Sequence, residues 1–161
     1  MTIAAKPIYL ASNAGKALSV LGDVYRVLAG GEDTGGAFSL LETRVLPGGG
    51  PPAHVHSRED EAFYALEGEI TFQLGDRRVV AGAGAFVQGP RGLPHAFKNE
   101  SQHPARLLVL VTPPDFENFI ADIATPFPSF DSPPAPVTAA DIQKLLTVAP
   151  GYGIEILPPQ Q

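Results

Sequence analysis

Between residues 15 and 112, the hydrophobic positions of the chain fall into short runs separated by turn residues. The runs are rich in Val, Leu, Phe and Tyr, and pairs such as Gly30-Gly31, Gly35-Gly36 and Pro47-Gly48 bound them. Short apolar runs between turn signals predict β-strands rather than helices. The expected strands are Val20–Leu21, Val24–Ala29, Ala37–Val45, Ala62–Leu66, Glu69–Leu74, Arg78–Val80, Ala85–Gln88, His95–Asn99 and Arg106–Val111. Many short strands predict an all-β sandwich or barrel, and Gly75-Asp76 predicts a tight hairpin turn.

The hydrophobic period changes after Pro113-Pro114. In Asp115–Ile123, the apolar residues recur at i, i+3, i+4 and i+7, which predicts one face of a helix. Residues 124–137 carry five prolines, a composition typical of a stiff, extended connector. The chain beyond residue 113 is therefore expected to form a helical extension of the barrel rather than a second domain.

A second helix is expected to begin at Thr138, because Asp141 follows three residues later in the pattern of a helix start. Ile142, Leu145 and Leu146 would then face the body of the protein. Pro150-Gly151 is expected to end this helix, and Gly153–Leu157 to form a short apolar tail.

Composition narrows the class of protein further. The length of 161 residues predicts a single domain over 1–161, with a barrel over about 15–112 and a helical extension over about 113–161. The net charge of −6 argues against nucleic-acid binding, and we expect no membrane span and no secretory signal, hence a cytoplasmic protein. The absence of cysteine excludes disulfides, thiolate zinc sites and cysteine nucleophiles, so nitrogen and oxygen atoms would hold any metal.

Three of the four histidines lie near acidic and turn residues in two segments. On a strand, His54 and His56 would place both imidazoles on one face, about 7 Å apart along the chain. A bend after His56 would return the carboxylate of Glu61 to the same point, and His95 would add a third imidazole from a later strand. Such an N3O set suits Fe, Mn, Ni, Co, Cu or Zn, and it leaves open positions for water, substrate or O2. A His-X-His pair alone is more often a surface pair, so spacing leaves both interpretations open.

The residues around these histidines match two signature motifs. The first motif, G-x5-H-x-H-x3/4-E-x6-G, is met by Gly48, His54, His56, Glu61 and Gly68, and the second, G-x5-P-x-G-x2-H-x3-N, by Gly84, Pro90, Gly92, His95 and Asn99. In these motifs the chain resembles the cupin superfamily. The resemblance implies a double-stranded β-helix, or jelly-roll barrel, in which His54, His56, Glu61 and His95 bind one divalent transition metal per chain. The motif glycines and proline would shape the turns, and Asn99 would lock a turn.

The outer segments extend the resemblance to nearly everything from about residue 17 onward. The helix Asp115–Ile123, the proline-rich connector and the closing segment Asp141–Leu157 resemble small bacterial cupins of the quercetin 2,3-dioxygenase-like group. The resemblance implies a homodimer, formed through apolar strands such as Arg106–Val111, and a small-molecule substrate.

Two classes of reaction and one non-catalytic role remain open at this point. The resemblance favours a dioxygenase acting on a flavonol-like or other enolisable molecule, in which Glu61 is both a metal ligand and the base for the substrate hydroxyl. The alternatives are a redox-neutral isomerase or decarboxylase of a small oxo compound, and a module that only binds a small ligand.

Strand parity suggests further roles for residues near the ligands. Phe63, Phe72 and Phe97 are candidates for stacking a planar substrate, or for filling the barrel core instead. Tyr64 has the opposite parity from Phe63 and is expected to face outward. The remaining polar neighbours are expected at the surface: Glu59 and Asp60 as a solvated turn, Arg91 as a surface charge, and His103 as a solvated loop residue.

Overall fold

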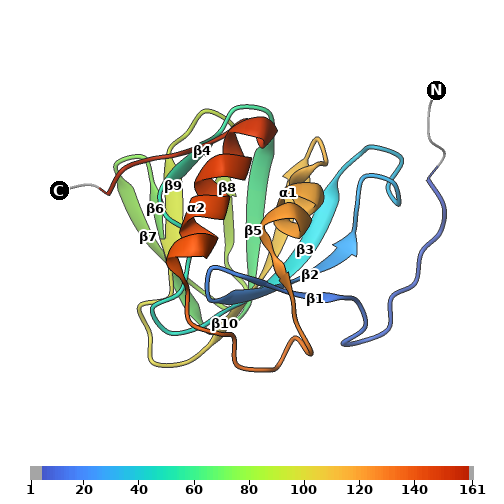
Figure 1. Ribbon diagram of the computed structural model, residues 1–161, viewed down its shortest axis with the longest axis horizontal. Helices are drawn as coiled ribbons and strands as arrows, with labels where there is room; N and C mark the ends of the chain where they lie inside the picture. The colour runs from blue at the N-terminus through green and yellow to red at the C-terminus, as the bar shows by residue number, and fades with distance from the viewer. Residues whose placement is uncertain (1–4, 160–161) are drawn as a thin grey trace.

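Two antiparallel sheets face each other across a hydrophobic core in the computed structural model, which describes residues 5–159 (Figure 1). In spatial order, the seven-stranded sheet contains β11 (Thr125–Pro126), β1 (Ala17–Val20), β2 (Asp23–Ala29), β3 (Ser39–Val45), β10 (Ala105–Thr112), β5 (Asp60–Glu67) and β8 (Phe86–Gly89). The five-stranded sheet contains β12 (Ile154–Ile156), β4 (His54–His56), β9 (His95–Lys98), β6 (Glu69–Leu74) and β7 (Arg77–Gly82). The expected all-β fold with short C-terminal helices is confirmed.

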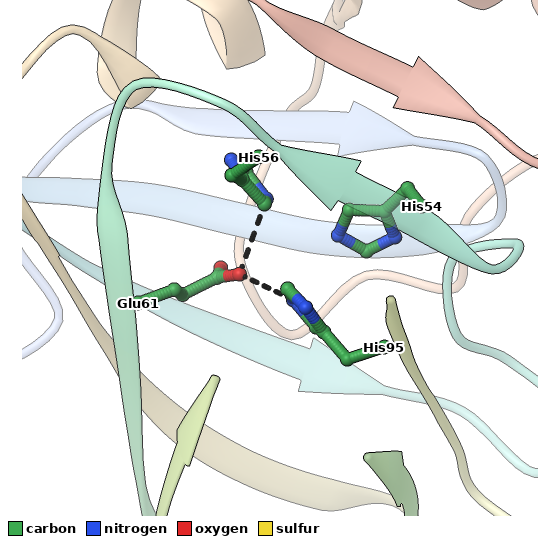
Figure 2. A group of neighbouring side chains, drawn as sticks. All are labelled: His54, His56, Glu61 and His95. Atoms are coloured by element: carbon green, nitrogen blue, oxygen red, sulfur yellow. Dashed lines mark hydrogen bonds and ion pairs between the residues drawn. The ribbon is translucent and has the colours of Figure 1, made fainter. Parts of the chain in front are cut away.

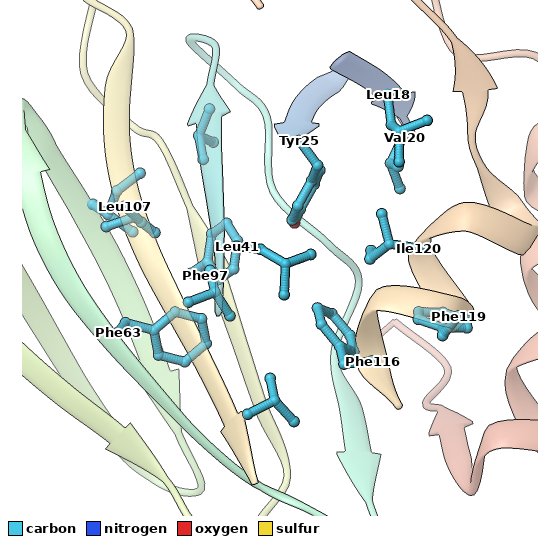
Figure 3. Packing of buried hydrophobic residues seen from close by; sticks show 14 of the residues in the cluster. Leu18, Val20, Tyr25, Leu41, Phe63, Phe97, Leu107, Phe116, Phe119 and Ile120 are labelled. Atoms are coloured by element: carbon cyan, nitrogen blue, oxygen red, sulfur yellow. The ribbon is translucent and has the colours of Figure 1, made fainter. Parts of the chain in front are cut away.

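The core forms where inward-facing residues of the two sheets meet. Along β10, buried and more exposed positions alternate, as expected for a strand with one face in the core. Phe63 of β5 packs against Phe72 of β6 and Phe97 of β9, with ring centroids 5.0 and 5.6 Å away, so an aromatic cluster joins the sheets. Figure 3 shows Phe63 and Phe97 in this core. The alternation of side chains along β5 also predicts the outward position of Tyr64 correctly, because this side chain is 45% exposed on the outer face.

The hairpin predicted at Gly75-Asp76 joins β6 and β7, whose residues Leu74 and Arg77 pair directly. The first predicted strand is misplaced at both ends, because β1 begins at Ala17, and Leu21 has φ 49° and lies in the turn between β1 and β2. The short apolar tail predicted at Gly153–Leu157 contains a strand that was not predicted, β12, which pairs with β4. Three residues give too short a pattern to reveal a strand without its partner.

The helical extension packs on one side of the sandwich. Helix α1 (Phe116–Ile123) buries the predicted face of Phe116, Phe119, Ile120 and Ile123. Helix α2 (Ala139–Val148) begins with a capping box, in which Thr138 and Asp141 each accept a backbone N–H from the other. A short 3-10 turn, η1 (Ala149–Tyr152), follows it, and the two α-helices lie against each other (Figure 1). Within residues 5–159, neither α-helix is long and apolar enough to cross a membrane.

The predicted inward face of α2 needs correction. Leu145 is buried, but Ile142 and Leu146 are 50% and 48% exposed. Helical residues three and four positions apart share a face, so contact through Leu145, Val148 and the following Ala149 leaves Ile142 and Leu146 outside. Helix α2 is therefore held to the body by a narrow apolar stripe.

The loop before β4 passes close to β9 and joins the two signature segments. The Gly48 N–H donates to Asn99 O at 2.7 Å, and the Asn99 N–H donates to Gly49 O at 2.9 Å. The Asn99 side chain is fully buried and donates to Val45 O and His103 O, which confirms its predicted role in locking a turn. The four motif glycines all have φ between 75° and 87°, as their turn role requires.

We expect Gly50→Ala to destabilise the protein far more than Gly48→Ala. Both residues have positive φ, but a Cβ at Gly50 would lie 2.1 Å from Phe97 O, whereas a Cβ at Gly48 meets nothing within 4 Å. Backbone strain alone predicts a loss of about 1 kcal/mol for Gly48→Ala, and the added clash raises the loss to about 3 kcal/mol or more for Gly50→Ala. Urea unfolding of both variants measures the difference, and equal losses would contradict the close packing of this loop on β9.

Candidate metal centre

The structure brings together the four residues that the sequence singles out as metal ligands. His54 and His56 come from β4, His95 from β9 and Glu61 from β5. One candidate ligand atom of each residue lies within 4.8 Å of the others, and all four side chains are buried (Figure 2). The cluster spans both sheets, because three imidazoles project from the five-stranded sheet and the carboxylate projects from the seven-stranded sheet.

Local strand geometry explains why these side chains converge. In β4, His54 and His56 are buried and the intervening Val55 is not, so both imidazoles lie on the inner face. His54 is the direct cross-strand partner of His95, which places their rings 4.5 Å apart. Opposite Glu61 on β8 stands Gly89, where a Cβ would lie 3.2 Å from His95 Nδ1, so the missing side chain leaves room for that ring.

Backbone carbonyls orient two of the imidazoles. His54 Nδ1 lies 2.8 Å from Pro52 O, and His95 Nδ1 lies 3.0 Å from Leu93 O. A carbonyl only accepts, so each Nδ1 carries the proton that it donates, and in the neutral rings Nε2 is left as a lone-pair donor. Hydrogen bonds of this kind hold metal-binding histidines in position in many proteins.

The charges of the cluster also favour a cation. Burial first, and then the neighbouring His95 and His56, lower the pKa of His54 to about 4, so His54 is neutral at pH 7. Burial opposes ionisation of Glu61, but the close contacts and charges of His56 and His95 outweigh it and hold the Glu61 pKa well below its usual range. Burial would likewise lower the pKa of His56, but its contacts with Glu59 and Glu61 raise that pKa to about 9. The site therefore stabilises positive charge next to Glu61.

Unpartnered polar atoms show that the residues fit a bound cation. Both ring nitrogens of His56 are buried without a hydrogen bond, and Glu61 Oε2 lies 3.2 Å from Nε2 without the required alignment. Glu61 Oε2 also lies 2.9 Å from His95 Nε2, the nitrogen that carries no proton in a neutral ring whose Nδ1 donates. Within residues 5–159, Glu59 and Glu61 have only imidazoles as ion-pair partners. A divalent transition metal among these atoms would satisfy the lone pairs and balance both buried carboxylates.

A small apolar cavity adjoins the cluster. Its volume is about 50 Å³, and its wall includes His54, His56 and Glu61. The rest of the lining consists of Val20, Leu21, Tyr25, Pro51, Pro52, Phe97, Phe116, Phe119, Ile120, Ile123, Leu145, Ile154 and Ile156. No lysine or arginine contributes to this lining, so the cavity offers an apolar environment to whatever meets the ligand set.

The aromatic residues expected near the substrate separate into two groups. Phe97 lines the cavity, so its role as a substrate contact stays a prediction. Phe63 and Phe72 do not line it: both are at most 2% exposed and fill the core between the sheets, which is the alternative that strand parity left open. Strand parity identifies inward side chains but does not distinguish the cavity from the packed core behind it.

Polar neighbours of the site follow the sequence analysis except at one position. Arg91 pairs with Asp60 at the surface, at 2.9 Å, and His103 lies in an exposed loop away from the cluster. Glu59 is the exception, because it is 4% exposed rather than solvated. Tyr25 and Phe116 also line the cavity, which the sequence does not predict. No local pattern marks these residues, since only the packing of distant elements brings them to the site.

Comparisons with known proteins agree with this geometry. A sequence profile described as the cupin domain matches residues 41–111. Among curated proteins, the quercetin 2,3-dioxygenase of Bacillus subtilis strain 168 is 26% identical over 123 residues, which make up 76% of this chain. The chain spans 36% of that relative's length.

Solved structures with low sequence identity share the fold. KdgF from a Halomonas species superposes with a TM-score of 0.63 at 14% identity, over 70% of this chain and 99% of its own. A protein from Thermotoga maritima, described as a predicted oxalate decarboxylase, gives a TM-score of 0.60 at 20% identity, over 65% of this chain and 97% of its own. The cupin-domain match over residues 41–111, the two-sheet fold and the His-His-Glu-His cluster together support a cupin-superfamily protein.

Proposed function

We propose that this protein is a metal-dependent dioxygenase of a flavonol-like or other enolisable small molecule. The proposal rests on one observation: the His3Glu cluster lies at the wall of an apolar cavity, and no lysine or arginine lines that cavity. Polyanionic substrates such as sugar phosphates need cationic partners when they are bound out of water, and this cavity supplies none. The similarity to a curated quercetin 2,3-dioxygenase supports the same substrate class.

The residues at the cavity wall would have three roles: binding the metal, accepting a proton and holding the substrate. A divalent metal held by His54, His56, Glu61 and His95 would supply Lewis acidity and, for the redox-active candidates, the O2 chemistry of the reaction. Glu61 is ionised and buried, so its carboxylate is the base available to take the substrate hydroxyl proton. Phe97 and Phe116 would hold a planar substrate by its faces and exclude water from it.

The cavity is too small and too well covered to admit a flavonol without a movement of the protein. A volume of about 50 Å³ holds a few water molecules, whereas drug-sized ligands occupy pockets of about 300–1,000 Å³. Helices α1 and α2 and strand β12 all contribute to the cover. Helix α2 is held by few apolar contacts, since Leu145 alone of its residues is buried. A flavonol-sized substrate would therefore have to displace α2 on entry.

Oxygen consumption tests the proposed function directly. Protein loaded with each candidate metal in turn is mixed anaerobically with a flavonol, an acireductone or a β-diketone, and O2 is then admitted. We expect the absorption band of one substrate to shift on binding, and O2 uptake to match its loss, with CO released if it is a flavonol. No O2 uptake with any metal and substrate of this panel would overturn the proposal.

Anaerobic turnover separates the alternatives. A redox-neutral isomerase or decarboxylase would convert its substrate without O2, and an isomerase would exchange a substrate C–H with solvent deuterium. A binding module would shift the absorption band without turnover under either atmosphere. Either result would replace the dioxygenase with the corresponding function.

A further inference from the structure

Glu59 is a buried carboxylate that neither the ligand set nor the signature motifs account for. It lies in the turn between β4 and β5, yet it is only 4% exposed. Its Oε1 atom lies 3.5 Å from His56 Nδ1, and its Oε2 atom is buried without a hydrogen-bond partner. Burying a carboxylate without a lysine or arginine is costly, so this position calls for a compensating charge nearby.

The outer contacts of the three imidazoles show what distinguishes His56. His54 and His95 both face a backbone carbonyl with Nδ1, and in each case the carbonyl belongs to the residue two positions earlier. His56 faces the Glu59 carboxylate with its Nδ1 instead. All three imidazoles therefore have an acceptor behind Nδ1, but only the one behind His56 is charged.

The opposite nitrogen of His56 faces the centre of the cluster. His56 Nε2 lies 3.2 Å from Glu61 Oε2, on the side away from Nδ1 (Figure 2). Glu59, His56 and the centre of the site thus form a line in which a carboxylate backs a ligand imidazole. A carboxylate in this position fixes the ring and increases the electron donation of its inner nitrogen.

We propose that Glu59 is a positioning residue for the metal, which acts through His56 to orient that ligand and to strengthen its bond to the cation. The inference rests on the metal site of the proposed function. It accounts for two otherwise unexplained observations, the burial of Glu59 and the buried ring nitrogens of His56 that have no hydrogen bond. With Glu61, Glu59 supplies two buried negative charges, which match the charge of one divalent cation.

The test compares Glu59→Gln with Asp60→Asn, using Co²⁺ alone as the probe. Both variants remove one negative charge from adjacent residues, but Asp60 points to the surface and pairs with Arg91. We expect Glu59→Gln to lower the Co²⁺ affinity about 10- to 100-fold in competition with a chelator. Asp60→Asn is expected to change it less than about threefold, because exposed charges are screened by solvent.

Two further measurements show whether Glu59 changes the Co²⁺ affinity through His56 or only through the stability of the fold. The visible absorption spectrum of the Co²⁺-loaded Glu59→Gln protein is expected to shift, because the ligand field of His56 changes, while the Asp60→Asn spectrum stays like that of the wild type. The melting temperature of the metal-free protein is expected to change little in both variants. A lower metal-free melting temperature with unchanged Co²⁺ affinity would show a purely structural role and overturn the inference.

These measurements can contradict the inference on Glu59 without contradicting the proposed dioxygenase activity, and the reverse also holds. If the wild type binds Co²⁺ and Glu59→Gln binds it equally well, the inference on Glu59 is wrong and the proposed reaction is unaffected. If the affinities differ as expected and no substrate consumes O2, the dioxygenase is wrong and the role of Glu59 stands. A wild type that binds no divalent metal would overturn both.

Discussion

Replacing His95 by alanine is expected to lower the affinity for a divalent transition metal by more than about 100-fold. Loss of a residue that only supports a ligand already costs about 10- to 100-fold, and His95 would be a ligand itself. His95 also pairs with His54 across β4 and β9 and contacts Glu61 from the other sheet. Its removal therefore takes one nitrogen from the set and loosens the contact between the two sheets at this point.

Metal content and melting temperature measure this effect together. Stripped protein is reloaded with one equivalent of metal, and bound metal is determined by elemental analysis after gel filtration. A ligand at 100 times its dissociation constant stabilises the folded state by about 2.7 kcal/mol, so we expect metal to raise the melting temperature of the wild type and not of His95→Ala. His103→Ala is the matched control, because His103 is exposed in a loop. Stoichiometric, tight binding by His95→Ala would show that the four residues are not the ligand set.

The sequence predicts the position of a site residue when that position depends only on the neighbouring residues of the chain. His54 and His56 share a face because of strand alternation alone, and Phe116 to Ile123 form one face because of helical periodicity alone. The turn role of Asn99 comes from the motif that it completes, although the strand prediction places Asn99 at the end of a strand. These features need no knowledge of distant contacts, and the structure confirms all of them.

The features that the sequence does not predict depend on how the sheets pack. Strand β12 forms only because β4 offers it a free edge, and Glu59 is buried only because the turn that carries it folds back against His56. The separation of Phe97 from Phe63 and Phe72 likewise depends on where the cavity ends between the sheets. Such outcomes follow from tertiary contacts, which periodicity and local propensity do not contain.

The expected homodimer remains a prediction. Strand β10 lies between β3 and β5, and its outward residue Leu110 is 38% exposed beside the exposed Tyr64 of β5. Apolar residues of this kind on an outer sheet face are suitable for pairing with a second copy, and the molecular mass in solution, measured by light scattering, tests this.

Phe116→Ala is expected to cost about 3 kcal/mol in the free energy of unfolding and to widen the cavity at the metal centre. Phe116 lies at the start of α1 (Figure 3), is 7% exposed and packs against His56 with a ring centroid distance of 5.7 Å. Truncation of a buried phenylalanine removes its apolar contacts and leaves space that the surroundings fill only in part. Because this space opens into the cavity wall, we expect the variant to admit bulky substrates more readily than the wild type.

Two matched phenylalanine variants distinguish the effect on stability from the effect on the cavity. Phe72→Ala, in the fully buried core away from the cavity, is expected to lose a similar free energy without changing the preference for substrate size. Phe86→Ala, at a side chain that is 65% exposed, is expected to change stability by no more than about 0.5 kcal/mol. Urea unfolding gives the free energies, and KM values for a small and a bulky substrate of the same reaction report the size preference. If Phe116→Ala leaves the ratio of these KM values unchanged while it loses stability like Phe72→Ala, then Phe116 is only a core residue, and substrate reaches the metal from another side.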